Sequence, residues 1–150
     1  MEGLQDYLVS VDSLKRLSRP KGYGKKYVNN LIKIVKNNNG VIFLAKQKGQ
    51  AIGCIAGIVD NIPLGEALGH KTKHKSARVL ELYVSPAFRG KKIGAFLMKK
   101  IEEYFLAKQC EQIKVEVYAP NKIAHKFYQK QGYKDESIDL VKNLVLFDKI

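Results

Sequence analysis

Apolar side chains between residues 24 and 40 recur with the period of an α-helix. They occupy the i, i+3, i+4 and i+7 positions that share one helix face, at Val28, Leu31, Ile32 and Val35. The polar run NNNG then ends the pattern. This segment therefore predicts a helix with one apolar face, and that face would pack against a sheet.

The residues before this helix are more polar. We expect a short helix in the segment DSLKRLSR, with Asp12 or Ser13 as its N-terminal cap and Pro20 just after its end. Residues 21–24 are expected to form a mobile turn between the two helices.

Two apolar runs rich in β-branched residues follow the long helix. VIFLAKQ and AIGCIAGIVD are separated by a short KGQ turn, which predicts an antiparallel hairpin. The next segment, residues 61–77, contains the polar run GHKTKHKS and is expected to be an exposed loop.

The second half of the chain alternates between strand and helix patterns. RVLELYVSP and QIKVEVYA have the character of strands, and each is followed by a helical pattern, in IGAFLMKKIEEYFLAK and NKIAHKFYQKQ. A strand, a helix and a strand in this order predict two parallel neighbouring strands joined by a right-handed crossover.

The chain finishes in two strand-like pieces, ESIDLV and LVLFDK. All these elements together indicate the α+β class, with a mixed sheet flanked by helices. The chain has 150 residues, of which 45% are apolar, and this suits one buried core. We therefore expect a single domain over residues 1–150.

No segment of the sequence indicates export or a membrane span. The first residues lack the basic start and apolar run of a secretory signal, and the longest apolar stretch, residues 51–59, is far shorter than the about 20 residues that cross a bilayer. Cys54 and Cys110 are expected to be reduced thiols. We expect a cytoplasmic protein without a membrane partner.

The balance of charge is strongly basic. Lys and Arg number 27 against 14 Asp and Glu, which gives a formal net charge of +13 and a field that attracts polyanions. One alternative function is therefore a non-catalytic module that binds RNA or another polyanion, supported by the run GHKTKHKSAR. Stacking aromatic side chains are not interleaved with that run, so nucleic acid is the less favoured partner.

The segment SPAFRGKKIGAFL lies between the carboxyl end of the first parallel strand and the amino end of the next helix. Unpaired amides and the helix dipole make such an end an anion site. Gly90 and Gly94 would let the main chain approach a ligand closely, and Arg89, Lys91 and Lys92 add positive charge. A diphosphate would fit this turn, although it has neither the Rossmann nor the P-loop pattern.

LYVSPAFRGKKIGAFLM resembles the acetyl-CoA-binding segment of the GNAT superfamily of N-acetyltransferases. The family pattern is Arg or Gln, two residues, Gly, one residue, then Gly or Ala. Arg89 and Gly94 match its ends, whereas Lys92 replaces its first Gly. VEVYAPNKIAHKFYQKQGY is similar to the second signature of the family, whose residues appear in the expected order at Asn121, Ala124, Tyr128, Gly132 and Tyr133.

The resemblance implies a GNAT-like acyl-CoA N-acyltransferase fold, in which a mixed, mostly antiparallel sheet contains a splayed central pair of parallel strands. It also implies acetyl-CoA as co-substrate, with the pantetheine along the first parallel strand and the diphosphate in the turn. The residues expected to bind it are Leu82, Tyr83, Val84, Arg89, Gly90, Lys91, Lys92, Ile93, Gly94, Ala95 and Asn121. No metal is expected, because His70 and His74 lack an accompanying cluster of Cys or carboxylate residues.

The implied reaction moves an acetyl group from the thioester to a primary amine by direct attack in a ternary complex. Tyr128 occupies the place of the family's general acid, which protonates the leaving thiolate. Glu116 is the first candidate for the general base, because it stands five positions before Asn121, where some family members that acetylate protein amino termini carry theirs. Glu81 or water would also serve, and the main-chain N–H of Tyr83 or Val84 would stabilise the oxyanion.

No motif defines the acceptor, which can be a protein amino group or a small-molecule amine. The net charge of +13 argues against polycations, because like charges repel, so an acidic protein segment or a neutral amine is expected. The protein is expected to be a monomer or a homodimer.

Overall fold

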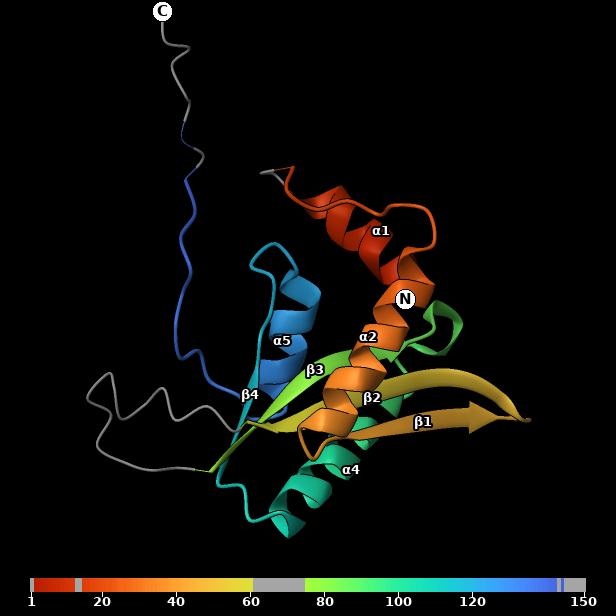
Figure 1. The fold of residues 1–150 in the computed structure, drawn as a ribbon, viewed down its shortest axis with the longest axis vertical. Helices are drawn as coiled ribbons and strands as arrows, with labels where there is room; N and C mark the ends of the chain where they lie inside the picture. The colour runs from red at the N-terminus through yellow and green to blue at the C-terminus, as the bar shows by residue number, and fades with distance from the viewer. Residues whose placement is uncertain (1, 13–14, 61–74, 143, 145–150) are drawn as a thin grey trace, which may run out of the picture.

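A computed structural model describes residues 2–12, 15–60, 75–142 and 144 of the chain. In this part of the protein, β-strands form one four-stranded sheet, and α-helices lie against it (Figure 1). The elements run in the order α1 (Glu2–Val11), α2 (Tyr23–Asn37), β1 (Val41–Gln47), β2 (Gln50–Asp60), β3 (Ser76–Val84), the 3-10 helix η1 (Pro86–Phe88), α4 (Ile93–Ala107), β4 (Gln112–Val115) and α5 (Lys122–Lys130). The prediction of an α+β fold is confirmed.

The strands lie in the order β1-β2-β3-β4. β2 is antiparallel to both of its neighbours, whereas β3 and β4 are parallel. The predicted hairpin is confirmed, and its turn contains Lys48 and Gly49 with positive φ angles of 47° and 80°. The predicted parallel pair is also confirmed, and α4 forms the crossover between its strands.

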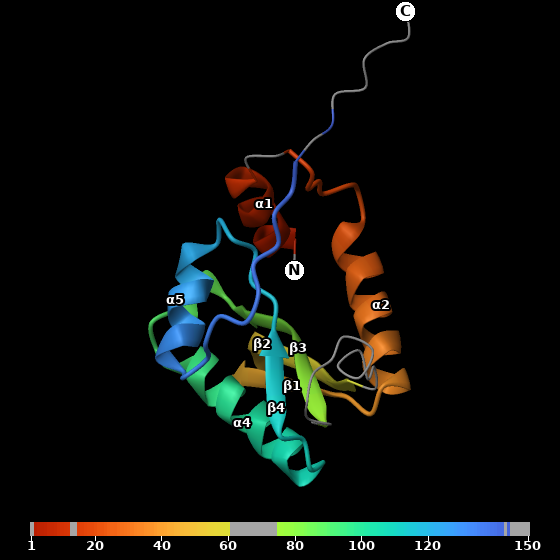
Figure 2. The same cartoon turned by 90° about the vertical axis from the view of Figure 1, so that its left-hand side faces the viewer.

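Helices cover both faces of the sheet. Figure 2 shows α2 on one face, with α4 and α5 on the other. Gly57 on β2 lets α4 approach closely, because a Cβ atom there would lie 2.8 Å from side-chain atoms of Ile101 and Phe105. The resulting apolar core between the sheet, α4 and α5 contains Ile55, Val59, Ala77, Val79, Leu97, Met98, Ile101, Phe105, Cys110 and Tyr128.

The predicted one-sided helix is confirmed as α2, but it starts earlier than expected. Val35 is buried and the helix contacts β1 and β2, whereas Val28 and Ile32 of the expected apolar face are 38% and 37% exposed. Tyr23 and Gly24 belong to its first turn, so the prediction of a mobile turn over residues 21–24 is wrong at these two positions. Because Tyr23 is helical, it shares a face of α2 with Tyr27, and the two rings stack with centroids 5.5 Å apart.

The first helix lies before the segment predicted for it. α1 ends at Val11, and residues 15–20 have no regular structure, so the helix expected in DSLKRLSR is wrong at these positions. Asp12 caps a turn instead, because its Oδ2 accepts the backbone N–H of Arg16 at 2.5 Å and of Leu17 at 2.7 Å. Lys15 has a left-handed φ of 53°, which interrupts a helix, and Ser13 lies outside the described residues.

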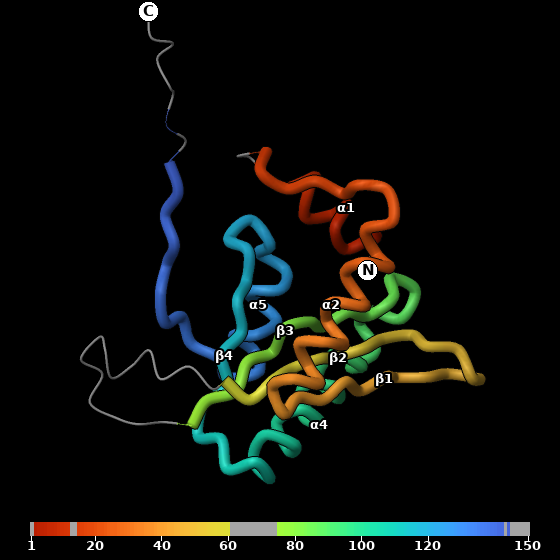
Figure 3. The backbone as a smooth tube through the Cα atoms, viewed as in Figure 1, coloured from red at the N-terminus to blue at the C-terminus, as the bar shows by residue number. Residues whose placement is uncertain are grey.

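The strand predicted in ESIDLV is absent from residues 136–141. Figure 3 shows the chain after α5 continuing as an extended segment that leaves the sheet, and Ile138 and Leu140 are exposed. β4 is an edge strand of the described sheet, and it ends at Val115 although QIKVEVYA predicted a longer strand. An alternating apolar pattern makes a strand where it has a neighbour to pair with, and residues 136–141 have none in the described part of the chain.

Other expectations fall partly outside the described residues. In the expected strand LVLFDK, only Leu144 is among the described residues. In the expected loop over residues 61–77, only the last three residues are described, and two of them, Ser76 and Ala77, begin β3. None of the helices in the described ranges is both long and apolar enough to cross a membrane. The prediction of a single domain stays a prediction.

Candidate active site

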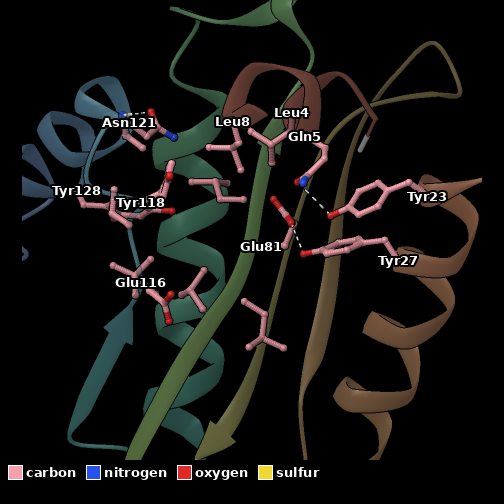
Figure 4. Close-up of a pocket in the computed structure, with 16 residues that line it drawn as sticks. Leu4, Gln5, Leu8, Tyr23, Tyr27, Glu81, Glu116, Tyr118, Asn121 and Tyr128 are labelled. Atoms are coloured by element: carbon pink, nitrogen blue, oxygen red, sulfur yellow. Dashed lines mark hydrogen bonds between the residues drawn. The ribbon is translucent and has the colours of Figure 1, made fainter. Parts of the chain in front are cut away.

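The two parallel strands separate partway along their length. β3 and β4 pair from Ser76 and Gln112 to Val79 and Val115, after which β3 continues to Val84 while residues 116–118 leave the sheet. A cavity of about 300 Å³ lies at this separation. Its walls come from β3, from residues 115–118 and α5 on the other side, and from α1 and α2 (Figure 4).

A β-bulge turns Glu81 towards this cavity. Val79 pairs with Gly57 of β2, and Glu81 pairs with the adjacent Ala56, so Leu80 is an extra residue in β3. The bulge reverses the alternation of side chains, and therefore Val79 packs in the core beneath α4 whereas Glu81 faces α2. In a regular strand Val79 and Glu81 would share a face.

Glu81 is a buried carboxyl group held by a tyrosine. Its side chain is 8% exposed, and the Tyr27 hydroxyl donates a hydrogen bond of 2.6 Å to its Oε2. Burial raises the pKa of Glu81 above its ordinary value, although the Tyr27 hydrogen bond opposes the shift. Tyr23 packs on Tyr27 and donates a hydrogen bond of 3.2 Å to Oε1 of Gln5, which lies on α1. Glu81 therefore has the raised proton affinity of a candidate general base.

Glu116 lines the same cavity from the opposite wall. It follows the end of β4 and its side chain is exposed. Figure 4 shows Glu81 near the tyrosines of α2, while Glu116 lies on the side of Tyr118 and Tyr128. The structure thus places both predicted carboxylates at one cavity, one of them buried and the other open to solvent.

Tyr128 lies on α5 at the wall beside Glu116 and is 8% exposed. Its ring packs edge-on against Phe127 and Tyr133, with centroids 5.2 and 5.7 Å away. Burial, aided by the negative charge of Glu81, raises the pKa of Tyr128 to about 12. The phenol is therefore a weaker acid than an ordinary tyrosine and stays protonated throughout the neutral range.

Asn121 joins the cavity to the start of α5. Its Oδ1 accepts the N–H of Ala124 at 3.2 Å, which makes it the N-terminal cap of the helix, and its side chain lines the cavity. The cap fixes the first turn of the helix that carries Tyr128.

The free edge of β3 leads away from the cavity. Leu82 to Val84 pair with β2 on one side, and β4 has ended on the other. Ser85 donates its N–H to the carbonyl of Ile52 in β2 at 2.9 Å, and alternate residues of a strand direct their backbone groups to opposite sides. The Val84 backbone is thus directed away from β2, and its carbonyl accepts a 3.0 Å hydrogen bond from Nε of Arg89.

The turn after β3 ends at an uncapped helix. No side chain caps α4, whose N-cap residue Lys92 has a left-handed φ of 61°, and Gly90 has φ 75°. Lys92 replaces the glycine of the family pattern, so the structure gives a reason for that glycine: the position needs a conformation that costs other residues about 1–2 kcal/mol. A Cβ atom on Gly94 would lie 3.3 Å from Phe127, which packs α5 against this turn.

The structure therefore brings some predicted residues together and leaves others apart. Leu82, Glu81, Glu116, Asn121 and Tyr128 line the cavity, whereas residues 89–95 lie beyond it at the end of β3. In the described part of the chain, no group of three His, Cys, Asp or Glu side chains is placed to bind a metal. His70 and His74 lie outside the described residues. Cys54 and Cys110 are free thiols, and burial raises the pKa of both.

Other cavity residues were not predicted. Leu4, Gln5 and Leu8 come from α1. Tyr118, a weaker candidate for the acid from the sequence, also lines the cavity and donates a hydrogen bond of 2.5 Å to Oδ1 of the buried Asp12, just after α1. Tyr23 and Tyr27 could have been found, because two tyrosines four residues apart share a helix face.

Known proteins are similar to this chain in sequence and in fold. Residues 8–133 match the model of the acetyltransferase (GNAT) family. An uncharacterized N-acetyltransferase of Archaeoglobus fulgidus is 30% identical over 132 residues, which cover 87% of this chain and 86% of that protein.

Solved structures agree with this match. A mutant of the BH1408 protein from Bacillus halodurans superposes with a TM-score of 0.77 at 18% identity, covering 96% of this chain and 88% of that one. The structure of AAC(6')-Iy in complex with a bisubstrate analogue that contains CoA has a TM-score of 0.65 at 17% identity and covers 84% of both chains. The chain belongs to the acetyltransferase (GNAT) family.

Proposed function

We propose that this N-acetyltransferase moves an acetyl group from acetyl-CoA to a primary amine by direct attack in a ternary complex. The observation that carries the proposal is the cavity at the separation of β3 and β4, which holds Glu81 and Tyr128 beside the free edge of β3. Family membership favours this enzyme over the alternative of a non-catalytic module that binds RNA.

The co-substrate would lie along β3 and the turn that follows. The pantetheine would pair with the unpaired backbone edge of Leu82 to Val84. The diphosphate would accept hydrogen bonds from the first amides of α4, at Ile93, Gly94 and Ala95, which no side chain caps. The nearby charges and turn residues that would assist are Arg89, Gly90, Lys91 and Lys92, and Asn121 would contact the arm inside the cavity.

The acetyl carbonyl would meet the backbone of Val84. The sequence offered the N–H of Tyr83 or of Val84 as the donor, and the structure favours Val84. The Ser85 N–H bonds to β2, and the N–H groups of successive strand residues point to opposite sides, so the Val84 N–H points away from β2. A fixed main-chain donor stabilises the oxyanion that develops when the amine attacks the thioester carbon.

Glu81 is the better supported base. Burial raises its pKa, which makes it a stronger base than an ordinary carboxylate, and it lies at the cavity wall, whereas Glu116 is exposed. In the proposed step Glu81 takes a proton from the incoming ammonium, the neutral nitrogen bonds to the acetyl carbon, the carbon–sulfur bond breaks, and the second proton lost from nitrogen passes to solvent.

Tyr128 would act on the leaving sulfur. A thiol has an ordinary pKa of about 8.5, so full proton transfer from a phenol with a pKa of about 12 is uphill at the start of the step. Tyr128 would therefore donate a hydrogen bond to the sulfur as the bond breaks. The proton follows as the thiol forms, and solvent restores the phenol.

The test is release of free thiol from acetyl-CoA across a panel of primary amines. Tyr128→Phe should lower kcat by about 10²–10⁴-fold, the usual contribution of acid catalysis. Tyr133→Phe is the matched control, because Tyr133 packs against Tyr128 but bonds to Glu102 outside the cavity. If acetyl-CoA gives neither binding heat nor thermal protection, or if Tyr128→Phe matches its control, the proposed mechanism is wrong.

A further inference from the structure

We infer that the cavity selects acceptors that enter as alkylammonium cations, and that it rejects amines carrying a carboxylate beside the reacting nitrogen. This inference rests on the proposed function and names the substrate class of the same site.

The lining of the cavity has the opposite sign to the rest of the protein. Lys and Arg make up 27 of the 150 residues, yet none of the 16 described residues that line the cavity is basic. Two of them, Glu81 and Glu116, are acidic and lie on opposite walls. The lining residues therefore offer negative charge to an ammonium group and no basic side chain to pair with a carboxylate, and Arg16, which lies outside the lining, is bound to the Tyr118 hydroxyl.

The hydrogen-bond donors around the cavity are already used inside the protein. The hydroxyls of Tyr27, Tyr23 and Tyr118 donate to Glu81, Gln5 and Asp12, respectively. The side-chain amide of Gln5 donates to the carbonyl of Ser18 at 2.9 Å. The hydroxyls of Tyr23 and Tyr27 and the second oxygen of Glu81 keep lone pairs for a ligand, which suits an ammonium with its three donors and no acceptor.

Few polar donors remain for an anionic group. Among the side chains that line the cavity they are the Nδ2 of Asn121, the second N–H of Gln5 and the hydroxyl of Tyr128, and the backbone edge of β3 beyond Val79 is reserved in the proposed reaction for the co-substrate. The rings of Tyr23, Tyr27, Tyr118 and Tyr128 add faces that attract a cation. Leu4 and Leu8 of α1 provide apolar contact for an alkyl chain.

The net charge of the whole protein does not decide this selection. Exposed charges are screened over about 8 Å at physiological ionic strength, whereas groups inside a cavity are screened much less. The charge of +13 thus affects the rate of encounter, and the local carboxylates set the affinity. The sequence-based preference for neutral amines and acidic segments is accordingly revised in favour of cations.

The experiment uses leucine and leucinol as acceptors. They share the side chain and the reacting nitrogen and have amines of similar basicity, but leucinol carries a hydroxymethyl group in place of the carboxylate. We expect kcat/KM for leucine to be at least about tenfold below that for leucinol, because the carboxylate meets like charges without a cationic partner. Isoamylamine, which lacks both groups, should react at least as well as leucinol.

A charge-reversal variant separates electrostatic selection from shape. Glu116→Lys should raise the leucine to leucinol ratio of kcat/KM by about tenfold or more, and Glu116→Gln should raise it less. The ratio cancels any general loss of activity, and thermal unfolding checks that both variants fold. A ratio that is the same in wild type, Glu116→Gln and Glu116→Lys would overturn the inference.

Calorimetry of the same amines with the protein–CoA complex keeps the inference separate from the proposed function. If leucinol binds more tightly than leucine but no amine is acetylated, the proposed function fails and the selection stands. If thiol is released equally well with both amines, the function stands and the selection is wrong. If neither amine binds to the complex, the selection is also wrong.

Discussion

The two faces of the sheet are packed in opposite ways. Beneath α4, apolar side chains fill the space so closely that a Cβ atom on Gly57 would collide with Ile101 and Phe105. Between α2, the free edge of β3 and the start of α5, a buried carboxyl group and several tyrosines surround a cavity. The bulge at Leu80 reverses the alternation of side chains along β3, so that Val79 packs in the core and Glu81 points towards the cavity.

The contrast teaches that the cavity exists where regular pairing stops. Up to Val79, β3 pairs with β2 on one side and with β4 on the other. Beyond Val79 it keeps β2 but no longer pairs with β4, and the cavity lies there. An unpaired strand edge and a buried carboxyl group both cost stability, and the dense face offsets that cost. Substitutions of cavity-lining residues should therefore change activity, whereas substitutions of core residues beneath α4 that do not line the cavity should change stability.

Glu81→Gln is the sharpest way to test this division. The variant keeps the shape of the side chain and an acceptor for Tyr27 but cannot take a proton, so kcat should fall by about 10²–10⁴-fold. The measurement is kcat for thiol release at saturating amine, compared with Glu116→Gln, so that loss of ammonium binding at Glu116 appears in KM and not in the comparison of bases. If Glu116→Gln loses more activity than Glu81→Gln, the base is Glu116, as first expected from the sequence.

The same variant should not lose stability at neutral pH. Burial raises the pKa of Glu81 in the folded protein above its value in the unfolded chain, so folding favours the neutral carboxyl. The contribution of this carboxyl to the free energy of unfolding is fully present below the pKa of the unfolded chain. It is lost as the pH rises through the pKa of the folded protein. Glu81→Gln should match wild type in unfolding free energy at about pH 4 and exceed it increasingly at higher pH. Urea unfolding at several pH values measures this, and a variant that is less stable than wild type at pH 8 would show that ionised Glu81 is stabilised where it lies.

Ile101→Ala tests the opposite face. Ile101 is fully buried against Gly57, so the substitution should lower the free energy of unfolding by about 2–5 kcal/mol. Because Ile101 lies beneath the sheet and not at the cavity, kcat/KM of the folded fraction should stay near that of wild type. Urea unfolding and thiol release on one preparation check both parts, and a large loss of kcat/KM at full folding would mean that the two faces are coupled.

The apolar pattern predicted most helices and strands, α2 included, but not the contacts that build the cavity. The hairpin and the order strand, helix, strand, helix of the second half follow from side chains that pack on α4, where periodicity and burial coincide. The bulge at Leu80 has no such signature, because one extra residue in a strand leaves the local pattern unchanged. The pairing of Tyr27 with Glu81 joins residues 54 positions apart and depends on the tertiary fold.

α1 shows a second limit of the sequence pattern. None of its residues is buried, so the apolar signal that would locate the helix is weak. Asp12 has the side chain of a helix cap and does bind two backbone amides, but these belong to a turn that follows α1. The capping side chain was therefore assigned to a helix in DSLKRLSR, whereas in the structure it binds the amides of a turn.

Tyr27→Phe measures how much the cavity face depends on one hydrogen bond. The Tyr27 hydroxyl stabilises the ionised carboxylate of Glu81, so its loss should raise the pKa of Glu81 further. We expect kcat/KM at neutral pH to fall by about tenfold, and its dependence on pH to shift upward. Tyr23→Phe is the control, because its hydroxyl bonds to Gln5. Equal pH profiles for the two variants would remove Tyr27 from the positioning of Glu81.

Lys92→Gly should have the smallest effect, and it probes the turn that joins the two faces. Lys92 has a left-handed φ of 61°, which glycine adopts without strain, so the substitution should raise the free energy of unfolding by about 0.5–1 kcal/mol. Lys91→Gly is the matched control, because Lys91 has no positive φ, so glycine there adds freedom to the unfolded chain and also removes the contact of the Lys91 ammonium with the Phe88 ring. The control should lose stability in urea unfolding while Lys92→Gly gains it. If both lose stability alike, the backbone at residue 92 is not strained, and the glycine of the family pattern needs another reason, such as close approach of the diphosphate.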